Sequence, residues 1–438
     1  MTTVEEVPDL DLDSSPRVGS RASRPVRIVG VVILVGLNCL LFWHLCQRLL
    51  DYGKLGMVSL VYTTLIGFYM LSRFVLAAFY RKPPDVGFFP DVAVIIPAYN
   101  EGRSILRSIE ACLGQDYPED KIRIICIDDG STDDTFAHMQ LAEIVHGDRL
   151  TCVSLGENRG KRAAMAEGVR RTESEICVFV DSDSEPAPDG IAKIVQGFVK
   201  GDVGAISGLT HARNAEENNL TRMQAARYFI SFQLLKASES VLGAVVCCSG
   251  CFSAYRRASI APLLEPWEAQ TFLGAPCTFG DDRSLTNMVV RSGYRTIYHS
   301  GALAWTEVPS DYRGFFRQQQ RWKKSWIRES PIFLSHVWRS RPLAFPSSFV
   351  TTLAAIVSPI VLIVNMFVYP ALGIALPLIY LLGLFLIASA YGIYHRTLAH
   401  NNHWKWAVIG TGFYVLFAPQ MFWALARVRD GSWGTRAG

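Results

Sequence analysis

The chain has 438 residues, of which half are hydrophobic and 19% are charged, and its formal net charge is +4. A soluble domain carries roughly a quarter charged residues, so this composition favours membrane segments in addition to a soluble core. The modest charge gives no indication of a nucleic-acid surface. The ten cysteines show no metal-knuckle spacing, which favours reduced, structural thiols over a disulfide framework.

The N-terminal part predicts a tail followed by two membrane helices. Residues 1–25 are polar, first acidic and then rich in Ser and Arg, which is typical of a disordered tail. Apolar stretches at 26–45 and 56–79 each approach the roughly 20 residues needed to cross hydrocarbon. Basic residues precede the first stretch and follow the second, so the positive-inside rule places both flanks in the cytoplasm. We therefore predict two transmembrane helices within residues 26–80.

Residues 90–308 have the pattern of a soluble α/β domain. Short apolar runs at 92–96, 122–127 and 176–180 alternate with segments of helical period. Two of these runs end directly at acidic loops. Because ligands of an open parallel sheet bind outside the carboxyl ends of its strands, this edge is the expected binding site.

The C-terminal part predicts an interfacial helix and further membrane segments. Residues 312–328 alternate basic and aromatic side chains at helical spacing, which indicates a helix along a membrane surface within 309–345. Three apolar segments follow within 346–426, near 349–368, 371–391 and 406–424. Five crossings would leave the arginine-bearing tail 427–438 outside, against the positive-inside rule. Either one late segment is re-entrant or interfacial, or a span is hidden; we favour a cytoplasmic tail.

Candidate donor-binding residues follow the first two strands. The first strand leads into Ala98, Tyr99 and Glu101, and the second into Asp128 and Asp129. A carboxylate at a strand end can accept hydrogen bonds from a uracil or ribose, and Tyr99 offers a face for a base. The alternative for the aspartates is an Asx turn that caps the next helix.

A candidate metal site follows the third strand. Asp181 and Asp183 lie two residues apart on a loop, so both can converge on Mg²⁺ or Mn²⁺, which prefer oxygen ligands and bridge to phosphates. The cation would assist the departing nucleoside diphosphate. Lys161 can meet that diphosphate as a point charge, although a solvated surface lysine is the ordinary explanation for such a residue.

Two later motifs supply a base and an acceptor contact. Inverting transfer needs a general base for the acceptor hydroxyl; Asp282 is the first candidate and Asp281 the second, with an acidic helix N-cap as the alternative. On a helix, Gln318, Arg321 and Trp322 share one face. Arg321 can hold a pyrophosphate, and the Trp322 ring can stack on an acceptor sugar.

Four motifs occur in order between the membrane segments: Asp128-Asp129, Asp181-Ser-Asp183, Gly280-Asp-Asp282 and Gln318-x-x-Arg321-Trp322. This set resembles the processive inverting family 2 glycosyltransferases, which include the cellulose, chitin and hyaluronan synthases. The resemblance covers residues 90–330 with motifs. It implies a GT-A α/β domain with a Rossmann-like mixed sheet, inserted between N-terminal and C-terminal transmembrane helices.

Within that family the chain is most similar to hyaluronan synthases of the bacterial type. The similarity lies in the segments Val246 to Gly250, Tyr255 to Arg257, Gln270 to Gly274, Gly280 to Thr286 and Arg321 to Ser325. The C-terminal residues Trp433, Gly434, Thr435 and Arg436 resemble that family's closing signature and are expected to form a gating tail.

The resemblance and the motifs together predict three sets of site residues. Donor binding is assigned to Ala98, Tyr99, Glu101, Asp128, Asp129, Lys161, Asp181 and Arg321. The metal is assigned to Asp181 and Asp183. Acceptor binding and processivity are assigned to Ser249, Gly250, Cys251, Gln318, Arg321 and Trp322.

The implied reaction alternates UDP-GlcNAc and UDP-glucuronate in one cytoplasmic site at the plasma membrane. The growing polysaccharide would leave through a channel of transmembrane helices surrounded by lipid, because an unpaired polar polymer cannot cross hydrocarbon unaided. The implied partners are nucleotide sugars and lipid, without nucleic acid, and the oligomeric state is left open.

One departure keeps an alternative open. Cys251 stands where many hyaluronan synthases have Pro, and rhizobial chitooligosaccharide synthases share much of the Cys-Cys and Tyr-Arg-Arg stretch. A chitin-type or poly-N-acetylglucosamine synthase that uses UDP-GlcNAc alone is therefore the second hypothesis. An inactive membrane scaffold fits less well, because the metal and base carboxylates are present. A lipid-linked monosaccharide transferase also fits less well, because it has little use for the Gln318 to Trp322 motif.

Overall fold

The computed structural model describes residues 53–374, 376–399 and 403–430, with five isolated positions between 29 and 47. The predicted tail at 1–25 and the motif at 433–436 lie outside the described residues. The first predicted membrane helix also lies outside them, apart from those isolated positions.

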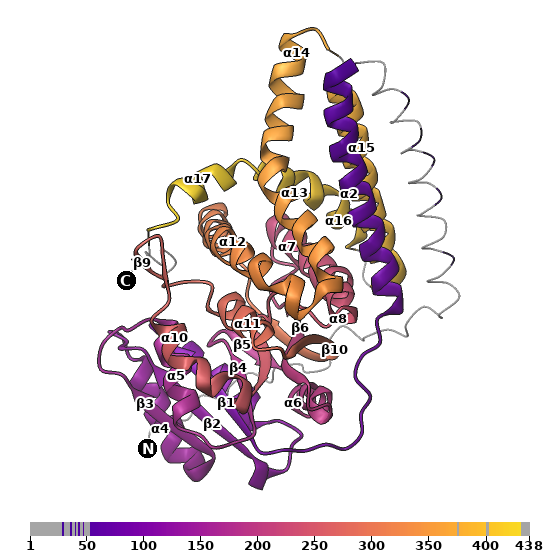
Figure 1. Ribbon diagram of the computed structural model, residues 1–438. Helices are drawn as coiled ribbons and strands as arrows, with labels where there is room; N and C mark the ends of the chain where they lie inside the picture. Colours follow the sequence, from indigo (N-terminus) through magenta and orange to yellow (C-terminus); the bar gives the residue numbers. More distant parts are fainter. Residues whose placement is uncertain are drawn as a thin grey trace.

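An eight-stranded mixed sheet forms the centre of the domain (Figure 1). Its strands, in spatial order, are β3 (Leu150–Ser154), β2 (Ile122–Asp128), β1 (Val92–Ala98), β4 (Ile176–Val180), β7 (Phe252–Arg256), β6 (Val203–Ala212), β10 (Arg295–Thr306) and β5 (Ser184–Pro186). The first four strands are parallel, β7 is antiparallel to both of its neighbours, and β10 is parallel to β6 and antiparallel to β5. The parallel strands end at one edge, where the sequence predicts the binding site. A separate two-stranded hairpin consists of β8 (Thr271–Phe272) and β9 (Ala275–Pro276).

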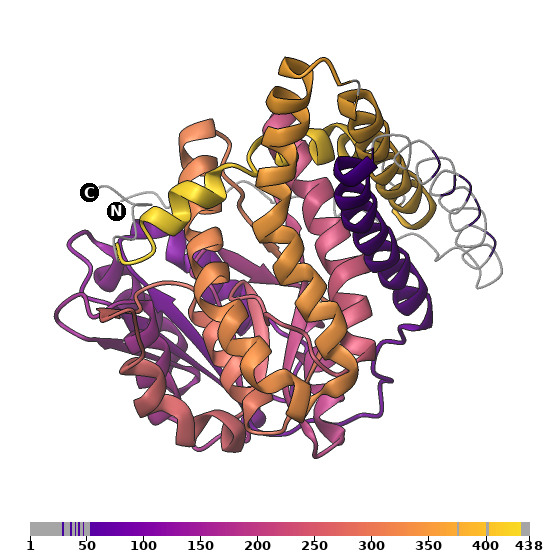
Figure 2. The ribbon, with the colours of Figure 1, turned by 45° about the horizontal axis from the view of Figure 1, so that its top comes forward.

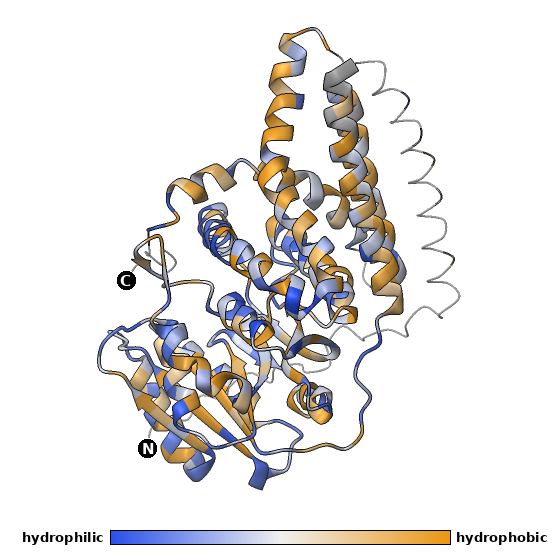
Figure 3. Cartoon of the chain, in the orientation of Figure 1, coloured by the Kyte–Doolittle hydropathy of each residue, from blue (hydrophilic) through white to orange (hydrophobic). Residues whose placement is uncertain are grey.

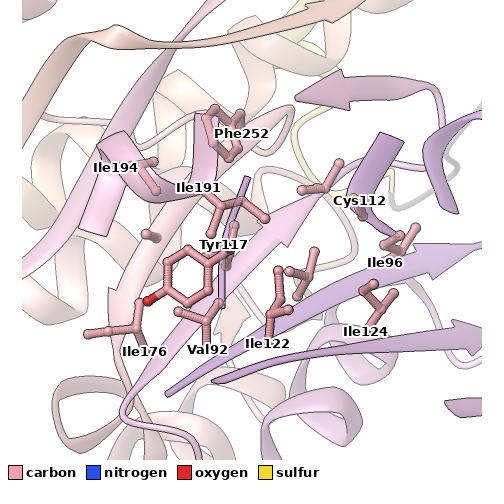
Figure 4. Close-up of a cluster of buried hydrophobic side chains, with 14 of the residues drawn as sticks. Val92, Ile96, Cys112, Tyr117, Ile122, Ile124, Ile176, Ile191, Ile194 and Phe252 are labelled. Atoms are coloured by element: carbon pink, nitrogen blue, oxygen red, sulfur yellow. The ribbon is translucent and has the colours of Figure 1, made fainter. Parts of the chain in front are cut away.

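Helices cover both faces of the sheet, which explains why its central strands are continuously apolar. Alternate residues of β1 enter different cores: Val92, Val94 and Ile96 join one cluster, and Ile95 joins the other. Figure 4 shows the first cluster, where Val92 and Ile122 lie beside the Tyr117 ring. The covering helices are α3 (Ile105–Leu113), α4 (Thr135–His146), α5 (Lys161–Arg170), α6 (Gly190–Ile194), α9 (Arg257–Ile260), α10 (Leu264–Glu268) and α11 (Asp281–Arg291).

Three described helices are long and apolar enough to cross a membrane, and all three extend away from the same end of the domain (Figures 1 and 3). The candidate spans are Val61–Phe79, Pro342–Ala371 and Tyr380–Leu398. They belong to α2 (Gly53–Phe79), α13 (Phe345–Ile363) with its π-helical continuation Val364–Val368 and α14 (Tyr369–Ala371), and α15 (Leu376–Leu398). The protein is therefore a membrane protein.

The last apolar segment is broken. Helices α16 (Trp404–Leu416) and α17 (Gln420–Ala426) are bent by 47° relative to each other, so the pair is either a broken span or a re-entrant loop. Figure 2 shows α17 turning away from α2, α13 and α15 and running past α12. The described chain thus has three candidate spans, or four if the bent pair crosses once.

The predicted interfacial helix corresponds to α12 (Tyr312–Ser340), which is 29 residues long and lies within the predicted range 309–345. Asp311 caps it by accepting from the Gly314 amide at 2.8 Å. The middle of the helix is buried. There, Arg328 and Glu329 form an ion pair at 2.6 Å, and their side chains are almost inaccessible. The helix therefore packs against the catalytic domain over much of its length, and its basic residues are not all on a lipid-facing surface.

Candidate active site

Asp128 ends β2 and Asp129 follows it directly, and both are buried. Asp128 accepts from the Ser154 hydroxyl at 2.8 Å and from the Ser131 amide at 3.1 Å. Asp129 accepts from the amides of Arg159 and Gly160 at 2.8 and 3.1 Å. Burial raises the pKa of Asp129 to about 6, although the two amides favour its charged form. The Asp128 carboxylate thus closes the turn to Ser131, but neither aspartate caps the next helix α4, whose N-cap is Asp134.

The loop after β1 contacts the loop after β4. Glu101 accepts from the hydroxyl of Ser182, the residue between the two aspartates of the predicted metal site. Ala98 is buried and its carbonyl accepts from the Asp129 amide at 2.8 Å, while Tyr99 is half-buried. These contacts connect the loops that follow β1, β2 and β4, so the three loops lie together at one edge of the sheet.

Asp181 contacts Lys161, the first residue of α5. Burial opposes the charge on Lys161, but the carboxylates of the site hold its pKa above the ordinary value. Gly250 lies against this pair, since a Cβ at Gly250 would come within 3.2 Å of Asp181 Oδ1 and 3.4 Å of Lys161 Nζ. Lys161 is thus a partner of the site and not a solvated surface lysine.

Asp183 is half-buried beside Asp181. Burial and the Asp181 charge both raise the pKa of Asp183, while hydroxyls of Thr306 and Ser184 donate to it at 3.3 Å. Two carboxylates that repel each other at the end of a strand fit a divalent cation. Within the described residues no cluster of three or more His, Cys, Asp or Glu side chains is arranged to hold a metal ion.

Asp281 and Asp282 both lie in the first turn of α11 but have different surroundings. Asp281 is buried and paired with Arg162 at 2.9 Å. Asp282 is half-buried, and its Oδ2 accepts from the Cys247 thiol at 3.3 Å. The partly accessible carboxylate is therefore the better placed of the two to meet an acceptor.

The loop before these aspartates packs directly on α12. Gly280 has a left-handed φ of +72°, and a Cβ there would overlap the Ser325 side chain. Arg328 donates to the Phe279 carbonyl at 2.6 Å and stacks over its ring. Lys324 also lies over that ring and donates to the Asp430 carbonyl at 2.8 Å.

Helix α12 brings its predicted motif to the same edge. Burial lowers the pKa of Arg321, and four nearby carboxylates oppose this shift: Asp181, Asp281, Asp183 and Asp282. Within the described part of the chain, the side-chain oxygen of Gln318 is buried and has no hydrogen-bond partner. Trp322 is 46% exposed, and its ring centroid lies 6.4 Å from that of Tyr228 on α7 (Asn219–Ile230).

The predicted acceptor loop precedes β7. The Ser249 amide donates to the Ser207 hydroxyl at 3.5 Å. Burial, reinforced by the charges of Asp181 and Asp183, raises the pKa of Cys251 to about 12. The loop therefore adjoins the Asp181 and Asp183 carboxylates.

The structure brings the candidate residues up to Trp322 into one edge of the sheet, and the four candidates of the C-terminal tail lie outside the described residues. Sequence reasoning missed Arg162 and Cys247. Arg162 follows Lys161 directly but gave no separate signal, and the cysteines were interpreted together as structural.

Comparisons with known proteins point to one family. Residues 90–325 match the model described as "Glycosyltransferase like family 2". An N-acetylglucosaminyltransferase of Azorhizobium caulinodans is 38% identical over 246 residues, which cover 56% of this chain and 62% of that enzyme, less than two thirds of its length. A hyaluronan synthase of Streptococcus pyogenes is 31% identical over 414 residues, which cover 93% of this chain and 94% of that enzyme.

A solved structure supports the fold. A mannosyltransferase of Pyrobaculum calidifontis, in complex with GDP-Man and Mn²⁺, aligns with a TM-score of 0.55 at 20% sequence identity and covers 92% of this chain and 98% of its own. The sheet has the GT-A arrangement expected from the sequence. The chain belongs to glycosyltransferase family 2 and is a membrane glycosyltransferase that uses a nucleotide-sugar donor.

Proposed function

We propose that the protein is a processive inverting polysaccharide synthase, most specifically a hyaluronan synthase that alternates UDP-GlcNAc and UDP-glucuronate. The observation that carries the proposal is the position of α12. This helix places Arg321 beside the carboxylates and leaves Trp322 exposed at the same edge. One helix thus serves both a diphosphate and an acceptor sugar, as a chain-elongating enzyme requires.

The proposed step uses the side chains of the site together with a divalent cation. Asp282 takes the proton from the acceptor hydroxyl, whose oxygen forms a bond to the anomeric carbon of the donor. The bond between that carbon and the UDP oxygen breaks with inversion, and UDP leaves. Lys161 and Arg321 are placed to neutralise the negative charge on the departing diphosphate.

Asp181 and Asp183 would hold Mg²⁺ or Mn²⁺. When bound, the cation supplies charge neutralisation at the diphosphate. The proposed roles of the other residues follow their positions: Asp128, Asp129 and Tyr99 bind the nucleoside, and Ser249, Gly250 and Cys251 contact the acceptor together with Gln318 and Trp322.

We further propose that the catalytic domain is cytoplasmic at the plasma membrane and that the polymer leaves through the protein's own membrane helices. The support is positional. The exposed Trp322 lies on a helix that packs against α13, the helix of the span Pro342–Ala371. An acceptor at this ring therefore has a short path to membrane-spanning segments.

Radiolabelled synthesis in membranes tests the proposal. UDP-GlcNAc and UDP-glucuronate are supplied singly and together, and the product is digested with a hyaluronan-specific lyase. The expected result is a lyase-sensitive polymer only when both donors are present.

The second candidate is a chitin-type or poly-N-acetylglucosamine synthase. It is favoured by the N-acetylglucosaminyltransferase relative, whose 38% identity exceeds the 31% of the hyaluronan synthase over a shorter region. Polymer formed from UDP-GlcNAc alone would establish this candidate in place of the first.

A further inference from the structure

The loop before β7 is fastened to the turn that carries Asp282. The Cys247 thiol donates to Asp282 Oδ2 at 3.3 Å. The next amide, that of Cys248, donates to the Thr286 hydroxyl at 2.9 Å, and this hydroxyl donates to the Asp282 carbonyl at 2.6 Å. Both the side chain and the backbone of Asp282 therefore depend on this loop.

Lys236 holds the other side of the same loop. Its ammonium donates to the Cys247 carbonyl at 2.5 Å and to the Ser207 hydroxyl at 2.9 Å, and it lies 4.7 Å from the centre of the Phe232 ring. Lys236 ends a π-helical turn, Ser231–Lys236, between α7 and α8 (Ala237–Val241). Such turns are rare and occur frequently at functional sites. Here the turn is the element that presents the lysine to the loop.

We propose that Cys247 is a positioning residue for Asp282, and that Lys236 acts through Cys247 by fixing its backbone. The inference rests on the proposed function, because it takes Asp282 as the base. The two can nevertheless be tested separately, since Asp282 can be the base whether or not the thiol orients it.

The chemistry of the contact is that of a neutral donor on a carboxylate. Burial and the negative charge of Asp282 raise the pKa of Cys247, so the thiol keeps its proton at neutral pH. The protonated thiol can therefore only donate to the carboxylate, and this hydrogen bond selects one rotamer of the Asp282 side chain.

Other groups act on Asp282 and are unchanged by substitutions at position 247. The charged and titratable groups around it come from the loop, from α5, from α12, from β7, from the π-helical turn and from its own helix: Cys248, Lys161, Arg321, Tyr255, Lys236, Asp281 and Arg283. The difference between two variants at position 247 thus isolates the thiol contact.

The test is the rate of UDP release by the full-length enzyme in detergent. It uses a series of UDP-GlcNAc concentrations, with and without UDP-glucuronate, so that kcat and the donor KM are obtained separately. Cys247→Ala removes the thiol that orients Asp282, so kcat falls severalfold while the donor KM changes little. Cys247→Ser keeps a hydrogen-bond donor and restores kcat. Lys236→Met lowers kcat, and Lys236→Arg restores part of it.

Cys152→Ser is the matched control. This half-buried thiol donates to the Met139 carbonyl at 3.3 Å from the edge strand β3, so kcat and the donor KM of this variant are expected to equal the wild type. UDP affinity and thermal unfolding identify any variant that fails to fold. A wild-type kcat in Cys247→Ala, alongside an inactive Asp282→Asn, overturns the inference and leaves the base intact. Full activity in Asp282→Asn overturns the proposed base itself.

Discussion

Arg162 Nε lies 2.9 Å from Asp281 Oδ1, and both side chains are almost completely buried. Arg162 also donates to the Trp267 carbonyl at 2.7 Å, so the guanidinium joins α5, α10 and α11. This pair gives Asp281 a structural partner, whereas its neighbour Asp282 remains partly accessible. We therefore expect replacement of Asp281 to affect stability and replacement of its neighbour Asp282 to affect activity.

Asp281→Ala is expected to destabilise the protein by about 3–5 kcal/mol, because it leaves a buried guanidinium without its charge partner. Thermal unfolding in detergent measures this loss. Replacing the pair together, as Arg162→Met with Asp281→Leu, is expected to recover much of the stability. An Asp281→Ala protein with wild-type unfolding and a selective loss of kcat would instead make Asp281 part of the chemistry.

Asp282→Asn is expected to keep the fold and the affinity for UDP while lowering kcat by about 10²–10⁴-fold, because the acceptor loses its base. Initial rates of polymer synthesis and calorimetric UDP binding separate these effects. Unchanged polymer output contradicts the assignment.

Asp129→Asn is expected to stabilise the protein at neutral pH. The free side chain titrates near 3.8 and the folded one has a pKa of about 6, so the folded state holds this proton more tightly. The stability that the proton confers is complete below pH 3.8 and is lost as pH rises through 6. Asn mimics the protonated group, so the variant gains about 1–3 kcal/mol at pH 7.5.

Thermal unfolding of both proteins at pH 5 and pH 7.5 tests this prediction, and the wild type should show the larger drop between the two. UDP binding by the variant is expected to weaken, since the proposed nucleoside contact loses its charge. Equal pH dependence in the two proteins contradicts the prediction.

Trp322→Ala is expected to shorten the polymer and to weaken the affinity for the acceptor by about tenfold. The reason is the loss of a stacking contact worth about 1–1.5 kcal/mol of binding free energy. Trp338→Ala is the matched control, since Trp338 lies on the same helix with 48% exposure against 46% for Trp322. Product size on gels compares them. Equal shortening in both variants would assign the effect to the helix surface and not to the acceptor contact.

Gly250→Ala is expected to lower activity, because the added Cβ would lie 3.2 Å from Asp181 Oδ1, so this carboxylate must shift by a few tenths of an ångström next to Lys161. The cation concentration needed for half-maximal rate should rise at the same time. Gly201→Ala serves as the control, since nothing lies within 4 Å of a Cβ there. Wild-type Mn²⁺ titration by Gly250→Ala would show that the carboxylate has room to move.

The catalytic fold was largely predictable from the sequence. The run 176–180 is β4 at its predicted bounds, and 92–96 and 122–127 extend by two and one residues into β1 and β2. These strands are buried on both faces, so their apolar runs are unambiguous. The acidic residues that follow them could be placed at one edge because parallel strands end together.

The remaining features depend on contacts between distant segments. The Arg162 partner lies 119 positions away at Asp281, and Cys247 meets Asp282 across 35 positions. Contacts between residues so far apart leave no periodic pattern in the sequence that could predict them. The burial of Arg328 and Glu329 in the middle of α12 was also unpredictable, since a charged pair on a helix ordinarily indicates a solvated face.

The contact between Gly280 and Ser325 has a consequence for engineering. Because a side chain at position 280 would occupy the place of Ser325, Gly280 cannot be replaced while α12 keeps its position, and Ser325 cannot be replaced by a larger residue on that side. A chimaera that imports the aspartate loop from a relative should therefore import the facing part of α12 as well. Directed evolution of donor choice should leave this pair fixed and sample the loop around Ser249 and Cys251, which meets the same site from the other side.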